Sequence, residues 1–241
     1  MTKTAVVIGV GAIQGLGAAI CRQFAQGGHR VIVSGRTQEK IDRVVADIES
    51  RDGLAEAFAA DVTQGDDIQK LIDHAATIGN VDAVIYNAGN NAIIPFDQLS
   101  AEQFEDFWRI GCMGGFLTAK AAVPLLLEQD RASLLFTGAS GSLRGKASFA
   151  HFASAKAGLR MLTQSLAREY GPQGLHVGHV IVDGVINGDR IRKIVPEYLE
   201  KLGEDGSLKP DEIAKAFTML HGQQPSAWTQ ELDLRPFSEN W

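Results

Sequence analysis

The residue best suited to chemistry in this sequence is Lys156, the one long cation on an otherwise small and apolar turn of the stretch Phe149–Leu166. Small residues around it would let a helix pack closely against a neighbour: Ala153, Ala155, Ala157 and Gly158. Leucines at helical spacing give the same stretch an apolar face: Leu159, Leu162 and Leu166. Lys156 is therefore either a helix lysine that reaches out to water or a residue that holds a ligand.

A glycine-rich turn near the start of the chain suggests which ligand. The segment Gly9-Val10-Gly11-Ala12-Ile13-Gln14-Gly15-Leu16-Gly17 follows a β-branched run and precedes a helical pattern. Glycines permit a tight turn and close backbone approach, and the helix N-terminus behind them favours phosphate. We predict a dinucleotide site that includes Gly9, Gly15, Leu16 and Gly17, rather than a purely structural turn. Lys156 is the best candidate for a partner of that cofactor.

The end of the second predicted strand indicates which dinucleotide would bind. Ser34-Gly35-Arg36 lacks the acid that usually binds an adenosine ribose 2′-hydroxyl, which also disfavours an S-adenosylmethionine site. Arg36 offers a planar cation suited to a 2′-phosphate, so NADP is favoured over NAD. The alternative for Arg36 is an ordinary solvated arginine.

The elements that must position these residues alternate along the whole chain. Predicted strands are Thr4–Ile8, Val31–Val33, Leu54–Ala60 (the weakest), Ala83–Tyr86, Leu134–Thr137, His176–Val182 and Glu231–Arg235. Helices with predicted bounds are Leu16–Gln26, Leu117–Leu127 and Asp211–Leu220, together with the helix that carries Lys156. Further helices are predicted through Ile41–Ile48 and Ile68–Ile72, and a short one near Val195–Leu202. Another begins at Ser100, with Gln103 placed for a capping box. This order predicts an α/β fold. It is a single-domain Rossmann fold over residues 1–241, a doubly wound parallel sheet of about seven strands with helices on both faces. The irregular, charged residues 187–208 are interpreted as a variable substrate lid.

Composition limits the remaining function classes. The net charge of −6 over 241 residues disfavours nucleic acid and anionic membrane as partners. Cys21 and Cys112 match no metal-ligand or paired spacing, so we expect no metal site and reduced thiols. The start MTKTAVVIGVG has no charged-then-apolar leader, and no apolar run is expected to reach membrane-spanning length. These features predict a cytoplasmic protein.

With these parts in place, the chain resembles the short-chain dehydrogenase/reductase family over nearly its whole length. The resemblance rests on an ordered series: the glycine turn, Asp61-Val62, Asn87-Ala88-Gly89, Lys156 on Phe152-Ala153-Ser154-Ala155-Lys156, and Asp183-Gly184. It implies that Asp61 and Val62 flank the adenine and that Asn87, Ala88 and Gly89 line the cofactor. It also implies that Lys156 binds the nicotinamide ribose and that Gly184 to Ile186 meet the carboxamide. A homo-oligomer, a tetramer before a dimer, would form across the helix Gly114–Leu127, the lysine helix and the apolar tail that runs from Leu232 through Trp241.

The departures from the family pattern concern the turn and the catalytic set. The family has three residues between its first glycine and its Gly-x-Gly. If Gly9 is that first glycine, the turn carries two extra residues. If Gly11 is, the spacing fits but the strand must run through Gly9. We prefer Gly9, because Ala5–Ile8 is the better strand. The family's tyrosine is Phe152 here, as in a divergent subgroup of the family. Its serine is Ala139, its asparagine is Gly111, and the proline of its Pro-Gly is Asp183.

Two functions remain open. One is an NADP(H)-dependent reductase or dehydrogenase of a small, apolar carbonyl or alcohol with an atypical catalytic set: Lys156, Ser140 and Phe152. The other is a nucleotide-binding pseudoenzyme with a regulatory or structural role. Phe152 has no proton to give, so Ser140, the weaker candidates Ser142 and His151, or water would have to replace the tyrosine.

Overall fold

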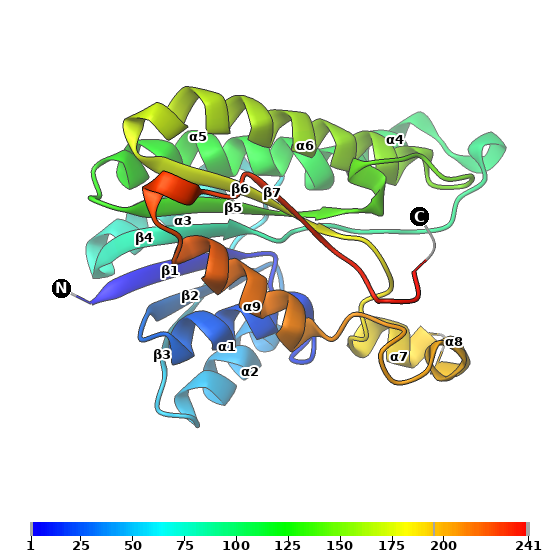
Figure 1. The fold of residues 1–241 in the computed structure, drawn as a ribbon, viewed down its shortest axis with the longest axis horizontal. Helices are drawn as coiled ribbons and strands as arrows, with labels where there is room; N and C mark the ends of the chain where they lie inside the picture. The colour runs from blue at the N-terminus through cyan, green and yellow to red at the C-terminus, as the bar shows by residue number, and fades with distance from the viewer. Residues whose placement is uncertain (1, 195, 240–241) are drawn as a thin grey trace.

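The computed structural model describes residues 2–194 and 196–239, and its centre is one seven-stranded parallel sheet (Figure 1). The strands are β1 Lys3–Ile8, β2 Arg30–Gly35, β3 Leu54–Ala59, β4 Asn80–Tyr86, β5 Ala132–Ala139, β6 Leu175–Val182 and β7 Glu231–Leu234. Their spatial order is β3-β2-β1-β4-β5-β6-β7. The order reverses between β1 and β4, which places the topological switch point of the sheet beside Gly9 and Asn87.

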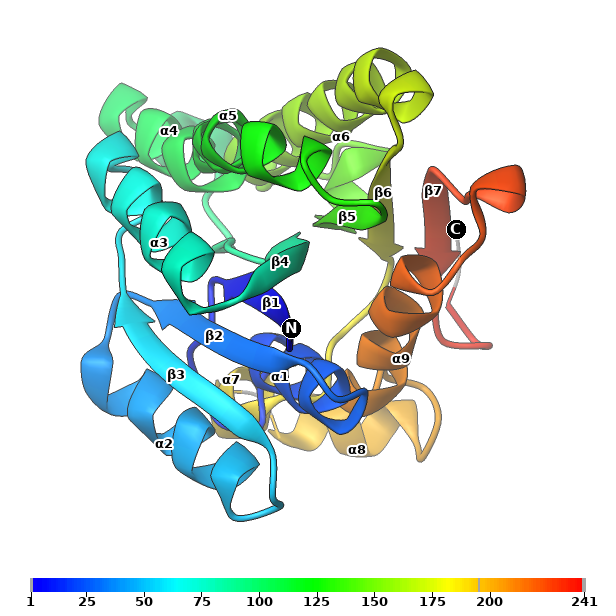
Figure 2. The same cartoon turned by 90° about the vertical axis from the view of Figure 1, so that its left-hand side faces the viewer.

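Helices cover both faces of this sheet (Figure 2). They are α1 Leu16–Gln26, α2 Gln38–Glu49, α3 Gly65–Ile78, α4 Ala101–Trp108, α5 Gly114–Leu127, α6 Ala150–Tyr170, α7 Asp189–Ile194, α8 Pro196–Leu202 and α9 Pro210–His221. One buried apolar cluster joins α1, α2 and α9 to one face, and a second joins α3, α5 and α6 to the other. The predicted doubly wound α/β fold is confirmed.

Local sequence signals account for the bounds of α1 and for the start of α4. Leu16–Gln26 is helical as predicted, and Ser100 and Gln103 form the predicted capping box at the start of α4. β3 forms although alanine and glutamate favour helix, because its backbone pairs with the buried β2.

The segment 187–208 is more regular than predicted. The short helix expected near its middle is α8, although Val195 lies outside the described residues, and α7 was not predicted. Figure 1 shows both helices at the end of the sheet opposite the N-terminus. They therefore lie at the carboxyl edge of the strands, where a lid would have to be.

The continuous helical segment Ala101–Leu127 corrects the expectation that no apolar run reaches membrane-spanning length. It joins α4, a π-helical turn at Arg109–Met113 and α5, and by length and composition it could cross a membrane, with a mean hydropathy of 1.6. In the structure 44% of its most apolar window is buried, and it packs against the sheet and α6. This is the position of a core helix that is partly exposed on its outer side.

Candidate active site

The glycine turn begins where β1 ends, at Gly9. Gly9 has a φ of 91°, and a Cβ there would lie 2.4 Å from the backbone nitrogen of Ala88. A Cβ on Gly11 would meet nothing within 4 Å. Since β1 stops at Ile8, the preference for Gly9 over Gly11 as the first glycine of the turn agrees with the structure. Of these two glycines, Gly9 is the one that backbone conformation and packing require.

The start of α1 fits a bound pyrophosphate. Gly15 is the N-cap residue, without a side-chain cap, and the first turn holds no acidic residue. The first turn of α1 therefore supplies no carboxylate of its own to compete with a phosphate for these backbone N–H groups. A Cβ on Gly17 would lie 3.0 Å from the Cα of Val10, so the backbone of the turn sits directly against the helix, with Leu16 buried beneath it.

The end of β2 contacts the same turn, and the end of β3 is hydrogen-bonded to the end of β2. The backbone carbonyl of Ser34 accepts hydrogen bonds from the N–H groups of Gly9 and Val10, at 3.0 and 2.8 Å. Arg36 follows one residue beyond β2 and is exposed. Asp61 and Val62 follow β3, where the Asp61 carboxylate accepts from both the backbone N–H and the hydroxyl of Thr63. The fold thus brings all three predicted adenosine-side residues to one edge.

A hydrogen-bonded chain joins the end of β4 to the glycine turn and to α6. The Asn87 side-chain amide donates to the Gly9 carbonyl at 3.1 Å and accepts from the Thr137 hydroxyl at 3.1 Å. The Lys156 ammonium donates to the Thr137 carbonyl at 2.9 Å. A Cβ on Gly89 would lie only 3.3 Å from Lys156 Nζ. Three predicted site residues, far apart in the sequence, therefore meet through Thr137, which the sequence analysis missed although it is a polar residue at the end of an apolar strand.

Lys156 is buried rather than reaching water. Its exposed fraction is 4%, and burial lowers the pKa of its ammonium to about 8. Burying a long cation without a carboxylate partner destabilises its charged form. Buried charged groups with such a lowered pKa are often found at functional sites, where they do not serve stability.

Phe152 lies one helical turn before Lys156 and packs on the 3₁₀ turn Ser140–Ser142. A Cβ on Gly141 would lie 3.0 Å from the Phe152 ring. The Phe152 ring thus packs against the turn that carries Ser140. Ser140 is half-buried, and its backbone carbonyl accepts hydrogen bonds from the N–H groups of Leu143 and Arg144. The structure thus brings the predicted catalytic trio of Lys156, Ser140 and Phe152 to one region.

The weaker proton-donor candidates point elsewhere. His151 is fully buried and packs on the Phe107 ring, with 4.1 Å between ring centroids, so it does not lie at the surface. The Ser142 hydroxyl accepts from the Ala139 N–H and lies 3.5 Å from His179 Nε2, on the inner side of the turn. Gly111, which the sequence analysis matched to the family's asparagine, has no room for a side chain, because a Cβ there would lie 2.7 Å from the Cβ of Ala155.

His179 belongs to a buried polar chain that sequence reasoning missed. Its Nδ1 lies 3.2 Å from Glu231 Oε2, and the Arg160 guanidinium donates one hydrogen bond of 2.6 Å to each oxygen of the same carboxylate. Burial lowers the pKa of His179 to about 4, so the ring is neutral near pH 7. With Glu231 accepting from Nδ1–H, Nε2 is left as an acceptor towards Ser142. A histidine inside the apolar run of β6 was the available sequence signal.

The loop after β6 lies at the same edge of the sheet as the loops after β1 and β4, because the strands are parallel. Gly184 has a φ of 152°, and a Cβ there would lie 2.7 Å from the Pro236 ring. Asp183, which the sequence analysis matched to the family's proline, is buried and receives two hydrogen bonds from Arg144, at 2.8 and 2.9 Å. Ile186 forms a parallel bridge with Leu208, at the two ends of the segment that carries α7 and α8.

α7 lies directly over the glycine turn. The Asp189 carboxylate accepts from the Gln14 backbone N–H at 3.2 Å, and Arg192 donates to the Gln14 side chain at 3.0 Å. Arg190 donates to the Asn91 carbonyl, in the loop after β4. The segment predicted as a lid therefore contacts two loops of the candidate cofactor site.

Comparisons with known proteins agree with this geometry. A family model described as short chain dehydrogenase matches residues 3–198. The 3beta-hydroxysteroid dehydrogenase 1 of Eggerthella lenta is 31% identical over 235 residues, which is 93% of this chain and 88% of that protein. A crystal structure of a short-chain dehydrogenase from Rhodopseudomonas palustris has a TM-score of 0.84 and 33% identity, covering 98% of this chain and 99% of that one.

A metagenomic short-chain oxidoreductase, solved in complex with NADP, shares the fold with a TM-score of 0.81, at 24% identity over 97% of each chain. Fold, site geometry and sequence similarity thus agree, and the chain belongs to the short-chain dehydrogenase family of oxidoreductases, which bind a nicotinamide cofactor.

Proposed function

We propose that this protein is an NADP(H)-dependent oxidoreductase that acts on a small, apolar carbonyl or alcohol with an atypical catalytic set. The observation that carries the proposal is the chain from Lys156 through Thr137 and Asn87 to Gly9. It joins the phosphate end of the candidate cofactor site to its catalytic end. A bound nicotinamide would supply or accept the hydride. Lys156 would hold its ribose, and Asn87 and Gly89 would line it.

Arg36 supports NADP as the cofactor. Arg36 is exposed and directly follows β2, whose Ser34 carbonyl accepts from the glycine turn, and the neighbouring positions carry no acid for a ribose hydroxyl. The bound NADP of the metagenomic relative is consistent with this choice. A charge-assisted hydrogen bond of this kind contributes about 1.5–3 kcal/mol.

We therefore expect NADPH to bind about 10- to 100-fold more tightly than NADH, since each 1.4 kcal/mol is a factor of ten. Arg36→Ala should remove most of that preference by weakening NADPH alone. Titration calorimetry with both nucleotides measures the effect, and Arg168→Ala, which removes a charge on α6 away from the turn, is the control. Equal affinities of the unaltered protein for NADPH and NADH would refute the assignment.

Apolar side chains around the site support the proposed substrate class. Loops that follow the carboxyl ends of β4, β5 and β7, together with α7 and α8, expose large apolar residues: Ile93, Phe96, Leu143, Ile194, Tyr198 and Phe237. Because the strands are parallel, these loops all lie at the sheet edge that carries Lys156. Such a rim favours an apolar carbonyl over a charged one.

Phe152 marks the place where a proton donor is missing. Phe152 and Lys156 are four residues apart on α6 and project from one face. A hydroxyl on the Phe152 ring would therefore enter the region where the reacting carbonyl oxygen must lie. Lys156 would be close enough to favour the phenolate.

Phe152→Tyr should raise the turnover of a poor ketone about tenfold and leave NADPH affinity nearly unchanged. A positioned general acid contributes about 10²–10⁴, and the gain should fall short of that because Ala139 offers no hydroxyl and Gly111 has no space for an amide. Steady-state kinetics would be compared with Phe152→Leu, which removes the ring, and Phe116→Tyr, which adds a hydroxyl on the exposed side of α5. Slower turnover of every accepted ketone by the tyrosine variant would show that Phe152 shapes the pocket instead.

One observation favours the alternative of a catalytically weak nucleotide-binding protein. Ala155 occupies the space beside Gly111, so the family's catalytic asparagine could not be restored without repacking α6. A protein of this second kind would bind NADPH as above, and Phe152→Tyr would still produce no turnover.

A further inference from the structure

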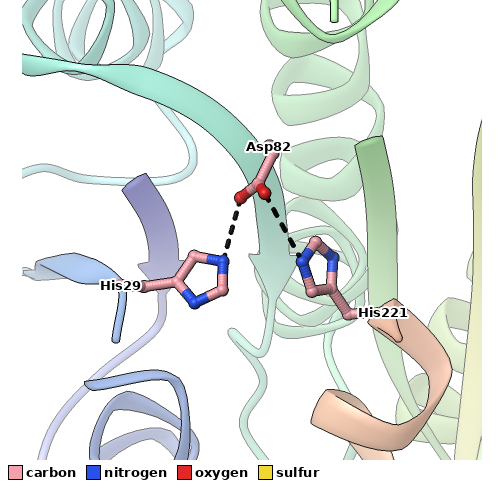
Figure 3. A group of neighbouring side chains, drawn as sticks. All are labelled: His29, Asp82 and His221. Atoms are coloured by element: carbon pink, nitrogen blue, oxygen red, sulfur yellow. Dashed lines mark hydrogen bonds and ion pairs between the residues drawn. The ribbon is translucent and has the colours of Figure 1, made fainter. Parts of the chain in front are cut away.

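Three side chains meet at the edge of the sheet opposite the candidate active site. His29 directly precedes β2, Asp82 lies near the start of β4, and His221 is the last residue of α9. Figure 3 shows the Asp82 carboxylate between the two imidazole rings, with one oxygen towards each. The fold therefore gathers two imidazoles and one carboxylate from segments far apart in the sequence.

The distances between the potential ligand atoms are close to those of a metal site. His29 Nε2 lies 3.0 Å from Asp82 Oδ1, and His221 Nε2 lies 3.6 Å from Asp82 Oδ2. All three ligand groups lie within 4.8 Å of one another. Around a tetrahedral zinc ion with bonds of about 2.0–2.1 Å, ligand atoms are about 3.3 Å apart. Small rotations of these side chains would thus complete three corners of a tetrahedron.

The surroundings hold the two rings in place. Asp82 is 1% exposed, and the side chains of His29 and His221 are 9% and 14% exposed. His221 Nδ1 lies 2.8 Å from the buried Ser133 hydroxyl, the kind of contact that orients a metal-binding imidazole and leaves its Nε2 available. His29 is held by ring packing, 5.3 Å from Phe24 and 5.2 Å from His221 between centroids.

Lys3 currently supplies the positive charge that Asp82 needs. Its ammonium lies 2.9 Å from Asp82 Oδ2, yet its side chain is 59% exposed and can turn into solvent. A hollow of about 240 Å³ opens beside the cluster, lined among others by Lys3, His29, His176, His221 and Trp228. Water from this hollow could occupy the fourth corner of a tetrahedral ion.

We propose that His29, Asp82 and His221 bind one divalent zinc-class metal ion, which replaces the Lys3 ammonium beside Asp82. Two imidazole nitrogens and one carboxylate, with one position open to water, form a ligand set that zinc accepts. The ion would connect the α1–β2 turn, β4 and the end of α9. This site is independent of the cofactor and of the proposed function.

The test uses the full-length protein after dialysis against a chelator, with Zn²⁺ alone as the calorimetric titrant. We expect one tight site per chain and an unfolding midpoint about 5–10 °C higher at a zinc concentration 100 times the dissociation constant. His221→Gln and Asp82→Asn should each weaken binding at least about 100-fold. Lys3→Ala should strengthen it several-fold, because the competing cation is gone. The visible spectrum of bound Co²⁺ should show four-coordinate geometry.

His74→Gln is the matched control, since His74 contacts Glu56 at 2.7 Å outside the cluster. It should bind Zn²⁺ like the unaltered protein. If Asp82→Asn fails to fold, His221→Gln still decides the question, because His221 ends a helix and its removal leaves the buried carboxylate paired with Lys3. Binding that survives His221→Gln, or is lost in His74→Gln, or is absent from the unaltered protein would overturn the proposal, as would unchanged affinity in Lys3→Ala.

Discussion

Lys156→Met is expected to weaken NADPH binding about 10- to 100-fold and at the same time to make the folded protein more stable at pH 7. NADPH affinity should fall because a charge-assisted hydrogen bond to the cofactor contributes about 1.5–3 kcal/mol. Stability should increase because burial lowers the pKa of Lys156 from 10.5 to about 8, which corresponds to about 3 kcal/mol against the charged form in the folded protein. Methionine fills a similar volume without a charge.

The same pKa gives the effect of Lys156 on stability a definite sign. Below pH 8 the folded and unfolded states both carry the Lys156 proton. Between pH 8 and 10.5 the unfolded chain holds that proton and the folded protein does not, so the free energy of unfolding should rise with pH across this window. Urea unfolding at several pH values should show the rise in the unaltered protein and its absence in Lys156→Met. Lys70→Met, at an exposed position on α3, should retain it. A Lys156→Met variant that is less stable at pH 7 yet binds NADPH normally would mean that Lys156 is structural.

Gly9→Ala is expected to destabilise the protein by about 3–5 kcal/mol, whereas Gly11→Ala should change stability by less than about 0.5 kcal/mol. At Gly9 the φ of 91° is unfavourable for alanine, and the added methyl would lie 2.4 Å from the Ala88 nitrogen. At Gly11 the methyl would enter open space. Denaturant unfolding of both variants measures the contrast.

The Gly11→Ala variant also tests whether Gly9 or Gly11 is the first glycine of the cofactor-binding turn. With Gly9 as that residue, Gly11→Ala should still bind NADPH within a few-fold of the unaltered protein. If Gly9→Ala is insoluble while Gly11→Ala is stable, the structural requirement at Gly9 is still supported. Greater destabilisation by Gly11→Ala than by Gly9→Ala would show that the turn is built differently.

Local patterns predicted most of the fold and part of the candidate site. The period of apolar residues predicted α1 from Leu16 to Gln26, and the end of the β-branched run indicated that β1 stops at Ile8. Lys156 was identifiable because a long cation among small residues contrasts with its neighbours. Each of these signals is contained in a few consecutive residues.

The remaining features depend on contacts between segments far apart in the sequence. α7 is charged and short, and it is held by the contact of Asp189 with Gln14 rather than by an apolar face of its own. The loss of space at Gly111 depends on Ala155 in another helix. The cluster of His29, Asp82 and His221 has no sequence spacing that would suggest a metal, because its members come from three separate elements. Only the folded chain shows these arrangements.

The most direct test of the proposed function is NADPH oxidation by the unaltered protein across a panel of aromatic and aliphatic ketones. Reduced nicotinamide deuterated at C4 would serve as the tracer, with calorimetric NADPH binding as the control. We predict slow but measurable transfer of deuterium to the carbonyl carbon of at least one apolar ketone, dependent on Lys156. Tight NADPH binding with no deuterium in any product, from the unaltered protein and from Phe152→Tyr alike, would contradict the proposal and identify a nucleotide-binding protein without hydride-transfer activity.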